Sequence, residues 1–572
     1  MSAPELEQPA PPRAVLLVGA TGAFGERLAE GLVRSGIAVI AVARSRPPLL
    51  RLAERLGPLV TIEQRTRDSI DAACLRTLSD RFPNLFAVAD ASGPFQTSDH
   101  ALPRAAIAAG LHYVDLADAR LFVRSITALD GDARDADVAV MSGASSTPAL
   151  SHAVLDTLVT DVRGIIAIDV SIAPGNRAPC GLSVVRSILS TVGQPIRAFY
   201  GGRWTDIPGW TLGRTITLPG AGVRRVTLCE TPDLDLLVSR YRPASDALFR
   251  AGLELRLLQD GTAALGLLVR CGLIRTLVPL AAPLRAMADL LKPFGSDTGG
   301  MQVAALVERA DGAVLRRVWS LTATAGVGPH IPTLPALAAL KALADGTLSW
   351  RGAAPCAGLL HYNAIAREFA PHAITIDRQE TTIPPSQMQR LLGARYDALP
   401  SVLRHAHDVR HVNVLAGHAD VTGPHGLGPR LVAWLFRLPR HGINLPLRVE
   451  MRREENGSET WSRIYPDVTM RSTLRNADPD TLQLDECFGP ISIRLQWQAT
   501  DSGLALQAVG ARLFGIPLPR FLQPRSQATE TVGSNGQFHF DVDIAMPLIG
   551  PIVSYRGDLS LLETSDDGAP AM

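Results

Sequence analysis

Residues 15–25 read VLLVGATGAFG, and this stretch decides the fold of the first half of the chain. Its first four residues are all aliphatic, which is typical of a parallel strand buried on both faces. Gly19, Gly22 and Gly25 follow at intervals of three, before a helix-like segment, ERLAEGLVRSG. Such glycines let the backbone approach a pyrophosphate, and the helix start offers free amides to phosphate. The stretch predicts a dinucleotide-binding turn, with a tight turn that binds nothing as the alternative.

The next apolar run ends in Arg44-Ser45-Arg46, where an NAD enzyme carries an Asp or Glu for the ribose hydroxyls. A guanidinium and a hydroxyl suit a 2′-phosphate, so the sequence favours NADP over NAD, with Arg44 and Ser45 as ligands. A solvated arginine at a strand end is the alternative. Asp68, after a third strand-like run, is expected either to border the adenine or to cap a turn.

Strand-like and helix-like segments alternate up to about residue 165. This alternation predicts a doubly wound parallel sheet of the Rossmann type for residues 14–165. Ligands of such sheets bind at the carboxyl ends of the strands. Segments 92–94 and 145–148, together with Asp115, are expected to lie at that edge.

Length and composition bound the other expectations. The 572 residues predict two to four domains, and 46% hydrophobic with 19% charged residues is typical of a globular protein with large cores. A net charge of +1 favours neither nucleic acid nor an acidic membrane surface as a partner. The six cysteines form no Cys-x-x-Cys pair and are expected to be reduced. The N-terminus has no signal region, which indicates the cytoplasm, and residues 1–13 and 564–572 are expected to be disordered tails.

The sequence indicates the residue that would donate a proton in an oxidoreductase reaction less clearly than it indicates the cofactor site. No tyrosine has a lysine four residues later, which excludes the Tyr-x-x-x-Lys pair of short-chain dehydrogenases. Tyr113 and Asp115 alternate on one predicted strand and so share a face. His330 lies in a glycine-proline turn that could fold over the cofactor. These three residues are the catalytic candidates, and a core tyrosine, a capping aspartate and a structural histidine are the alternatives.

Several phrases in order, GATGAFG, ASGPF, AAIAAGLHYVDLAD, SGASSTPAL and TATAGVGPHIPTLPALAALKALADG, resemble the saccharopine dehydrogenase-like oxidoreductases over roughly residues 13–380. The resemblance implies that an α/β domain, residues 166–380, covers the nicotinamide side and that its end returns to the first domain. It implies that the glycine turn holds the pyrophosphate and that the segment after the fourth strand lies under the nicotinamide ribose. The implied residues are Gly19, Ala20, Thr21, Gly22, Ala23, Phe24 and Gly25 for the first role, and Ser92, Gly93 and Pro94 for the second.

The substrate region departs from that family. Saccharopine dehydrogenases bind a highly charged amino-acid adduct, and residues 166–350 contain no compact set of paired charges. Segment 263–291 is instead strongly apolar with three arginines. It fits an apolar substrate pocket, a helix at a lipid surface, a pair of core helices or a homodimer interface, but not a transmembrane span. Some relatives with this layout are assigned as enoyl reductases of lipid synthesis, so we expect an apolar carbonyl or enoyl substrate.

After residue 380 the sequence pattern changes from alternating helices and strands to mainly strand-like segments. A helix is predicted over 387–403, followed by strands in a mainly antiparallel β domain over residues 386–563. The phrases LGARYDALPSVLRHAH, WSRIYPDVTMRS, LDECFGPI and PIVSYRGDL resemble a C-terminal domain family of unknown function that recurs behind saccharopine dehydrogenase-like domains.

Aromatic and arginine side chains in this second half form the other candidate site. Trp461, Arg463 and Tyr465 alternate onto one strand face, which suits an anionic or amphipathic ligand. A closed barrel with a salt-bridged mouth explains the same residues without a ligand. The further candidates in this sheet are Arg471, Glu486 and Arg556.

Histidines also gather in the second half. His405, His407 and His411 follow one another closely, but their spacing does not aim them at one point and no metal is predicted.

Two functions remain open. The chain is expected to be an NADP-dependent oxidoreductase acting on an apolar carbonyl or enoyl compound, with a small-molecule substrate and no nucleic-acid partner. The alternative is a non-catalytic NADP-binding sensor or scaffold whose C-terminal β domain binds lipid or a protein partner.

Overall fold

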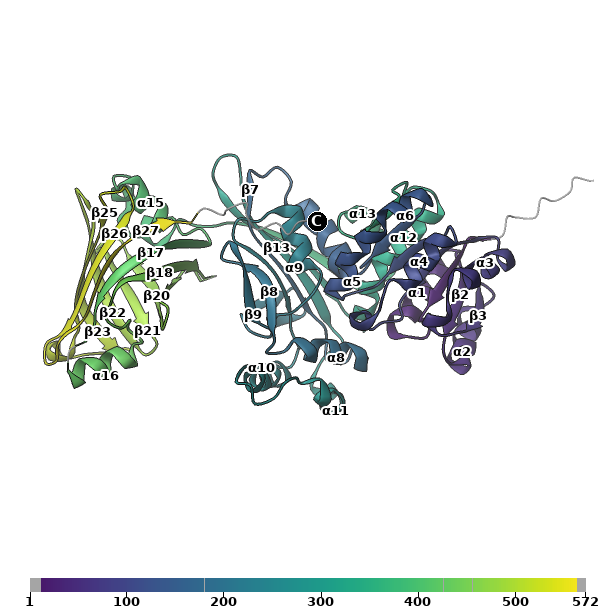
Figure 1. Cartoon of the computed structure of the whole chain (residues 1–572), viewed down its shortest axis with the longest axis horizontal. Coiled ribbons are helices and arrows are strands. Elements are labelled where there is room, and N and C mark those ends of the chain that lie inside the picture. The colour runs from purple at the N-terminus through teal and green to yellow at the C-terminus, as the bar shows by residue number, and fades with distance from the viewer. Residues whose placement is uncertain (1–11, 179–180, 425, 455, 563–572) are drawn as a thin grey trace, which may run out of the picture. The chain divides into compact units, whose positions relative to one another are not determined.

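A computed structural model describes residues 12–178, 181–424, 426–454 and 456–562 of the chain (Figure 1). The chain divides into two compact units, residues 1–200 with 204–381, and residues 201–203 with 382–572. Most of the expected N-terminal tail, the whole expected C-terminal tail and Cys180 lie outside the described residues.

The first unit contains a parallel sheet of seven strands in the order β15-β6-β5-β4-β1-β2-β3. Its strand order reverses between β1 and β4, which makes the carboxyl ends of these two strands the expected ligand crevice. This topology confirms the predicted doubly wound sheet. The strands are β1 (Ala14–Val18), β2 (Ala38–Ala43), β3 (Val60–Gln64), β4 (Leu85–Asp90), β5 (His112–Asp115), β6 (Ala139–Ser142) and β15 (Gly352–Pro355).

Helices cover both faces of this sheet because successive residues of each strand face opposite sides. In β1, Leu16 packs with the cluster under α3 and α4, whereas Leu17 packs with the cluster under α1 and α12. The helices are α1 (Ala23–Arg34), α2 (Arg46–Leu56), α3 (Ala72–Arg81), α4 (Ala101–Ala108), α5 (Arg120–Ser125), α6 (Asp130–Asp135), α7 (Ser151–Leu158), α12 (Leu334–Ala344) and α13 (Tyr362–Arg367).

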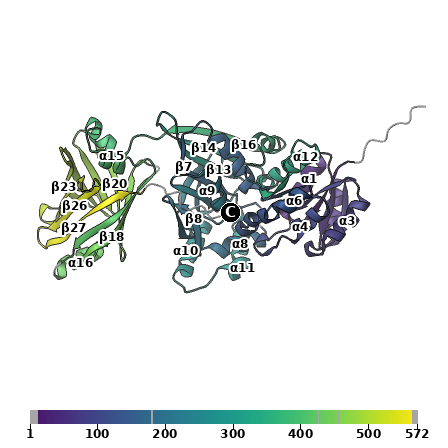
Figure 2. The same ribbon diagram turned by 45° about the horizontal axis from the view of Figure 1, so that its top comes forward.

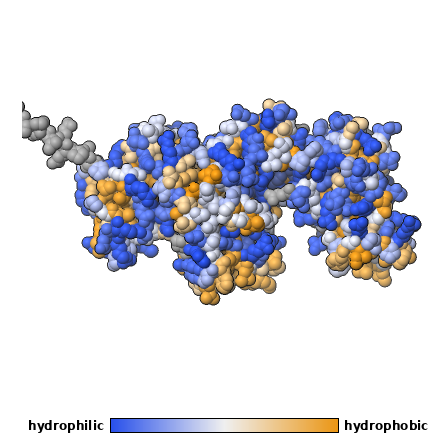
Figure 3. All heavy atoms as spheres, turned by 180° about the vertical axis from the view of Figure 1, so that it is seen from behind, coloured by the Kyte–Doolittle hydropathy of each residue, from blue (hydrophilic) through white to orange (hydrophobic). Residues whose placement is uncertain are grey.

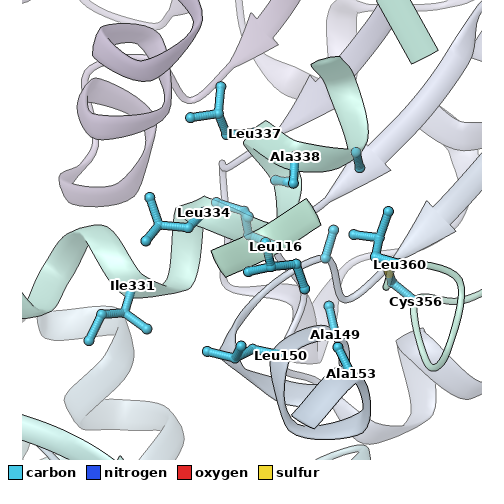
Figure 4. Packing of buried hydrophobic residues seen from close by; sticks show 14 of the residues in the cluster. Leu116, Ala149, Leu150, Ala153, Ile331, Leu334, Leu337, Ala338, Cys356 and Leu360 are labelled. Atoms are coloured by element: carbon cyan, nitrogen blue, oxygen red, sulfur yellow. The ribbon is translucent and has the colours of Figure 1, made fainter. Parts of the chain in front are cut away.

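Helix α12 ties the end of the first unit back to its beginning. Figure 4 shows Leu334 and Ala338 of this helix in the buried cluster that also contains Leu116, which follows β5, and Ala149. The chain thus leaves the parallel sheet, builds a second sheet and returns to the first sheet with β15.

The second sheet of the first unit is mixed and has nine strands. Its central strand β7 pairs parallel with β12 and antiparallel with β13. Figure 2 shows β7, β13, β14 and β16 of this sheet from a second side. The strands are β7 (Gly164–Ala173), β8 (Pro195–Tyr200), β9 (Arg203–Pro208), β10 (Arg214–Leu218), β11 (Gly222–Leu228), β12 (Asp246–Ala251), β13 (Gly299–Glu308), β14 (Val314–Ala323) and β16 (Ile374–Thr382). The helices beside it are α8 (Leu182–Thr191), α9 (Asp233–Tyr241), α10 (Arg256–Arg270) and α11 (Ala281–Leu290).

The apolar segment 263–291 forms the end of α10, a connection and α11. Its inner side packs with α8 through residues such as Val269 and Leu277. Leu273 and Leu290 remain 73% and 77% exposed, so the pair of helices is only partly a core element. In the described part of the chain, no helix combines the length and apolarity that crossing a membrane requires.

The second unit is an antiparallel sheet that closes on itself, because β22 pairs with β21 on one side and with β23 on the other. Ten strands form the ring, and the short β24 pairs with β23. The strands are β17 (Val412–Thr422), β18 (Gly442–Arg453), β19 (Glu459–Ile464), β20 (Thr469–Asp478), β21 (Gln483–Phe488), β22 (Ile491–Thr500), β23 (Gly503–Leu513), β24 (Ile516–Pro517), β25 (Arg525–Val532), β26 (Phe538–Met546) and β27 (Gly550–Leu561).

Among the residues that the structure describes, the α-helices beside the closed sheet are α14 (Gln387–Leu392), α15 (Ser401–His407) and α16 (Leu427–Leu435). The prediction of one helix over 387–403 is wrong. Gly393 adopts φ +54° directly after α14, and Pro400 precedes α15, so the helical stretch breaks into separate pieces. The mainly antiparallel character of this unit is confirmed.

Candidate functional site

The glycine turn lies at the carboxyl end of β1, against the segment that follows β4. Gly19 adopts φ +79°, and a Cβ there would lie 2.7 Å from the Ser92 Cα. A Cβ on Gly25 would overlap the Gly19 carbonyl. Only glycine therefore allows this turn to approach both its own helix and the neighbouring loop.

The first turn of α1 presents backbone donors to solvent. Gly22 and Ala23 are exposed, and Thr21 and Phe24 are half-buried. Among the described residues, the amides of Ala23, Phe24 and Gly25 have no hydrogen-bond acceptor, because the first helical bond runs from Glu26 to Gly22. The Ala20 amide is instead used within the sheet, where it donates to the Val42 carbonyl. Three free amides at a helix N-terminus fit a pyrophosphate.

Arg44 and Ser45 follow β2 and are both exposed. Ser45 is the residue before α2 and makes no capping hydrogen bond through its side chain. In the described part of the chain, the Arg44 guanidinium makes no hydrogen bond or ion pair, and only its carbonyl accepts, from Gln64. Both side chains are therefore available to bind an anion.

Asp68 is exposed in the turn Arg67–Ser69. It is not the cap of the following helix, because the Asp71 carboxylate accepts the Cys74 amide at 2.8 Å. The place of Asp68 near the adenine of a bound cofactor stays a prediction.

The sequence-based candidates omitted Asp90, the buried residue that ends β4. Its Oδ1 accepts from the amide and the hydroxyl of Ser92 at 2.9 and 2.5 Å. Its Oδ2 accepts from Arg67 Nε at 2.9 Å and from the Tyr113 hydroxyl at 3.3 Å. Asp90 thus fixes the loop under the expected nicotinamide ribose. An aspartate that directly ends a fully apolar run, LFAVAD, is the signal that could have revealed it.

Asp115 ends β5 and lies beside Asp90 in the strand register. Its Oδ1 accepts from the Ala117 amide at 2.9 Å, the Ser142 hydroxyl at 3.0 Å and the Gly143 amide at 2.7 Å. Its Oδ2 is buried and has no hydrogen-bond partner among the described residues. Burial raises the Asp115 pKa to about 7, although these hydrogen bonds oppose the shift. This carboxyl can therefore exchange a proton near neutral pH.

Tyr113 and His330 are placed differently. The Tyr113 side chain is fully buried, and burial, with the nearby charges of Asp115 and Asp90, raises its pKa well above the usual value. Its hydroxyl therefore supports Asp90 as a hydrogen-bond donor. His330, in the turn Gly328–Thr333, stacks on His372 with ring centroids 4.5 Å apart. Burial and the neighbouring His372 lower the His330 pKa to about 4, and no contact joins this histidine to Tyr113 or Asp115 in the described part of the chain.

The candidate residues of the second unit divide between the two faces of the closed sheet. Trp461 and Tyr465 are buried in its core, and the Arg463 guanidinium lies 5.4 Å from the Trp461 ring. Arg463 also makes an ion pair with Glu486 at 3.3 Å. Four of the six candidates thus come together inside. The other two, Arg471 and Arg556, are exposed.

A second buried ion pair lies in the same interior and was missed from the sequence. His407, at the end of α15, faces Glu530 of β25 with 2.6 Å between Nε2 and Oε2. Trp461 and Trp497 pack around its ring. Burial alone would lower the His407 pKa, but the charge and hydrogen bond of Glu530 raise it above the usual value.

The neighbouring histidines do not form a cluster with His407. His405 is exposed whereas His407 is buried, so their side chains point apart. Among the described residues, no three His, Cys, Asp or Glu side chains are placed to hold a metal.

Comparisons with known proteins agree with this division. Residues 399–559 match a domain of unknown function, DUF4166, which confirms the expected C-terminal domain family. No curated protein matches the sequence.

The solved structures similar to this chain include several dehydrogenases. Apo saccharopine dehydrogenase (L-Glu forming) from Saccharomyces cerevisiae is 13% identical, with 65% of this chain and 100% of that chain covered and a TM-score of 0.47. The WlbA (WbpB) dehydrogenase from Thermus thermophilus, in complex with NAD and alpha-ketoglutarate, is 12% identical, with 42% and 72% covered and a TM-score of 0.26. A short-chain dehydrogenase/reductase from Serratia marcescens is 18% identical, with 24% and 74% covered and a TM-score of 0.20. Sequence identities and TM-scores this low do not establish the function of this chain.

Proposed function

We propose that the first unit is an NADP-dependent oxidoreductase that reduces or forms an apolar carbonyl or enoyl compound. The observation that carries the proposal is the exposed first turn of α1, with three free amides beside the unpaired side chains of Arg44 and Ser45. These groups provide donors for a pyrophosphate and a cation for a 2′-phosphate.

The nicotinamide of such a cofactor, when bound, supplies or accepts the hydride. The chain itself has to orient the substrate and to provide the accompanying proton. We assign the proton to Asp115, because its Oδ2 is free of hydrogen bonds and its pKa is about 7. Tyr113 and Arg67 act through Asp90, which holds the Ser92 loop in place. No role in the reaction is proposed for His330.

The choice of NADP is tested at Arg44. We expect Arg44→Ala to weaken NADPH binding about tenfold to a hundredfold, because a charge-assisted hydrogen bond contributes about 1.5–3 kcal/mol. NADH binding should be unchanged, since NADH lacks the 2′-phosphate. Arg51→Ala, an exposed arginine further along α2, is the matched control and should leave both affinities unchanged. Fluorescence titration with each cofactor measures the difference, and equal loss of both cofactors would contradict the assignment of Arg44.

Turnover is tested with a series of enones and ketones of increasing chain length. We expect NADPH oxidation to rise with chain length, because segment 263–291 exposes apolar side chains such as Leu273 and Leu290. Asp115→Asn should abolish turnover and spare NADPH binding, because the amide cannot supply the proton. Tyr113→Phe should lower turnover in the same direction. Unchanged turnover in Asp115→Asn would remove this residue from the mechanism.

The alternative is an NADP-binding sensor or scaffold without catalysis. The complete burial of Asp115 favours it, because a carboxyl with no exposed surface has no contact with a substrate in this conformation. Tight NADPH binding without oxidation of any compound in the series would support this second function.

A further inference from the structure

Three of the connections at one end of the closed sheet carry exposed apolar side chains, and we call their described residues the apolar tip: 423–424 and 426–441 with α16, 514–524, and 547–549. Strand pairing places all three at the same end. Thr422, at the end of β17, pairs with Ser554 near the start of β27. Arg525, at the start of β25, pairs with Ala545 near the end of β26.

Helix α16 carries its apolar face outward. Its residues Pro429 and Ala433 are buried against the sheet. Leu427, Leu431 and Trp434 recur at helical spacing and are 87%, 65% and 75% exposed. A surface helix of a soluble protein normally shows the reverse arrangement, with the apolar stripe toward the core.

The other two connections add exposed apolar side chains to the same end. Phe514 and Ile516 are 79% and 70% exposed, and Leu548 is 71% exposed. Figure 3 shows hydrophobic residues gathered at the lower end of this unit, where Figure 1 places α16. An exposed apolar patch of this kind marks a binding surface rather than ordinary protein exterior.

The charges of the apolar tip have one sign. Its three connections contain no aspartate or glutamate and four arginines, Arg430, Arg437, Arg440 and Arg520. All four arginines are exposed. The nearest acidic partner lies outside these connections, where Asp467 is 3.6 Å from Arg440.

We propose that the apolar tip docks on the surface of an anionic lipid bilayer. Leucine, phenylalanine and tryptophan at a helix face and at loop ends enter the boundary between headgroups and acyl chains, while arginines bind anionic headgroups. The apolar residues stand on three separate projections rather than in a groove, which suits a fluid lipid surface. This proposal does not depend on the reductase activity of the first unit.

The exposed face of α10 and α11 offers a matched comparison within the chain. It also exposes leucines, Leu273 and Leu290 among them, but its charges are of both signs. Asp289 is 2.7 Å from Lys292 and 3.8 Å from Arg285. Asp289 thus engages two of the cations of this face, whereas three of the four arginines of the apolar tip have no carboxylate partner among the described residues, so the apolar tip is the favoured contact.

Flotation of the full chain with lipid vesicles tests the proposal. We expect binding to vesicles of phosphatidylcholine with about one third phosphatidylglycerol, and much weaker binding to phosphatidylcholine alone. The double variant Leu431→Glu/Trp434→Glu should lower the bound fraction about tenfold or more, because two exposed apolar side chains that would enter the lipid are replaced by anionic ones. Leu273→Glu/Leu290→Glu is the matched control and should bind as the unchanged chain does.

Three outcomes would overturn the proposal. The unchanged chain could fail to float with anionic vesicles, or the control variant could lose binding while the tip variant keeps it. Light scattering after size exclusion could also show a dimer that the tip variant converts to a monomer without any vesicle binding, which would assign this surface to a second copy. Circular dichroism and urea unfolding of both variants establish whether each remains folded, which is expected because all four substituted residues are exposed.

Discussion

The two units bury charged groups in different places. In the first unit, Asp90 and Asp115 lie at the carboxyl ends of neighbouring parallel strands. In the second unit, the pairs His407–Glu530 and Arg463–Glu486 lie inside a closed sheet. A parallel sheet binds its ligands at the carboxyl ends of its strands, whereas a ligand can reach the interior of a closed sheet only through the ends of the barrel.

This difference separates polar groups that serve a site from polar groups that hold a core. The carboxylate oxygens of Asp90 and Asp115 accept hydrogen bonds largely from the amides and hydroxyls of neighbouring loops. Two carboxylates of the closed sheet, Glu530 and Glu486, are instead paired with His407 and Arg463 inside the core. We therefore expect substitutions in the closed sheet to affect stability most, and substitutions at the edge to affect both stability and cofactor binding.

The largest effect is expected for Glu530→Gln. The change removes the anion that faces buried His407, and breaking a buried pair by removing one partner costs about 3–5 kcal/mol. Urea unfolding followed by tryptophan fluorescence should show this loss, because Trp461 and Trp497 pack around His407.

The paired control for that experiment is His407→Leu/Glu530→Met. Two apolar residues in place of a buried ion pair leave no unmatched charge, so most of the lost stability should return. NADPH affinity should be the same in both variants, because the first unit holds the glycine turn. A change of less than about 1 kcal/mol in Glu530→Gln would show that the pair is not a core element.

A smaller effect is expected for Arg67→Ala at the sheet edge. The guanidinium is 15% exposed and bonds to the fully buried Asp90 carboxylate at 2.9 Å. Its removal leaves that carboxylate without a cation, and we expect a loss of about 2–3 kcal/mol in the free energy of unfolding. NADPH affinity should fall as well, because Asp90 holds Ser92.

Asp68→Ala is the control beside it, one residue along the same turn. Asp68 is exposed, so the stability should change by less than about 0.5 kcal/mol. If Asp68→Ala also lowered NADPH affinity, the prediction that this residue borders the adenine would be supported. If Arg67→Ala changed neither stability nor affinity, Asp90 would have no part in shaping the site.

The same contrast explains what the sequence could reveal. Strands such as 15–18 are buried on both faces and read as unbroken apolar runs, so the parallel sheet and its edge were predictable. The sequence of strand β25, RSQATETV, gives little indication of a buried strand, because it carries almost no apolar residue. Its one buried position is Glu530, which is compatible with a core only because α15 brings His407 to it.

Arg67 and Asp90 were missed for a related reason. They are 23 residues apart in the sequence, and only the parallel order of the strands makes them partners. Spacing in the sequence carries no sign of such a pair. The glycine turn, in contrast, is local, because the strand, the turn and the helix are consecutive.

The smallest effect is a difference in how the two units respond to pH. The Asp115 pKa is raised from 3.8 to about 7, so the native first unit binds this proton more tightly than the unfolded chain does. The corresponding stability is present at low pH and is lost as the pH rises from about 4 to 7. The His407 pKa is raised above 6.5, so its contribution to the second unit is complete below that value and is lost only at higher pH.

Thiol labelling during urea unfolding can follow the two units separately, with Cys356 as the probe of the first and Cys487 as the probe of the second. Between pH 5 and 7 we expect the first unit to lose about 2 kcal/mol through Asp115, whereas the contribution of His407 to the second unit begins to fall only above about pH 6.5. Asp115→Asn should remove this pH dependence from Cys356 protection and leave Cys487 protection unchanged. If the stability of the first unit fell equally with pH in Asp115→Asn and in the unchanged chain, another buried acid would cause the pH dependence. Asp233 is such an acid, because burial also raises its pKa to about 7.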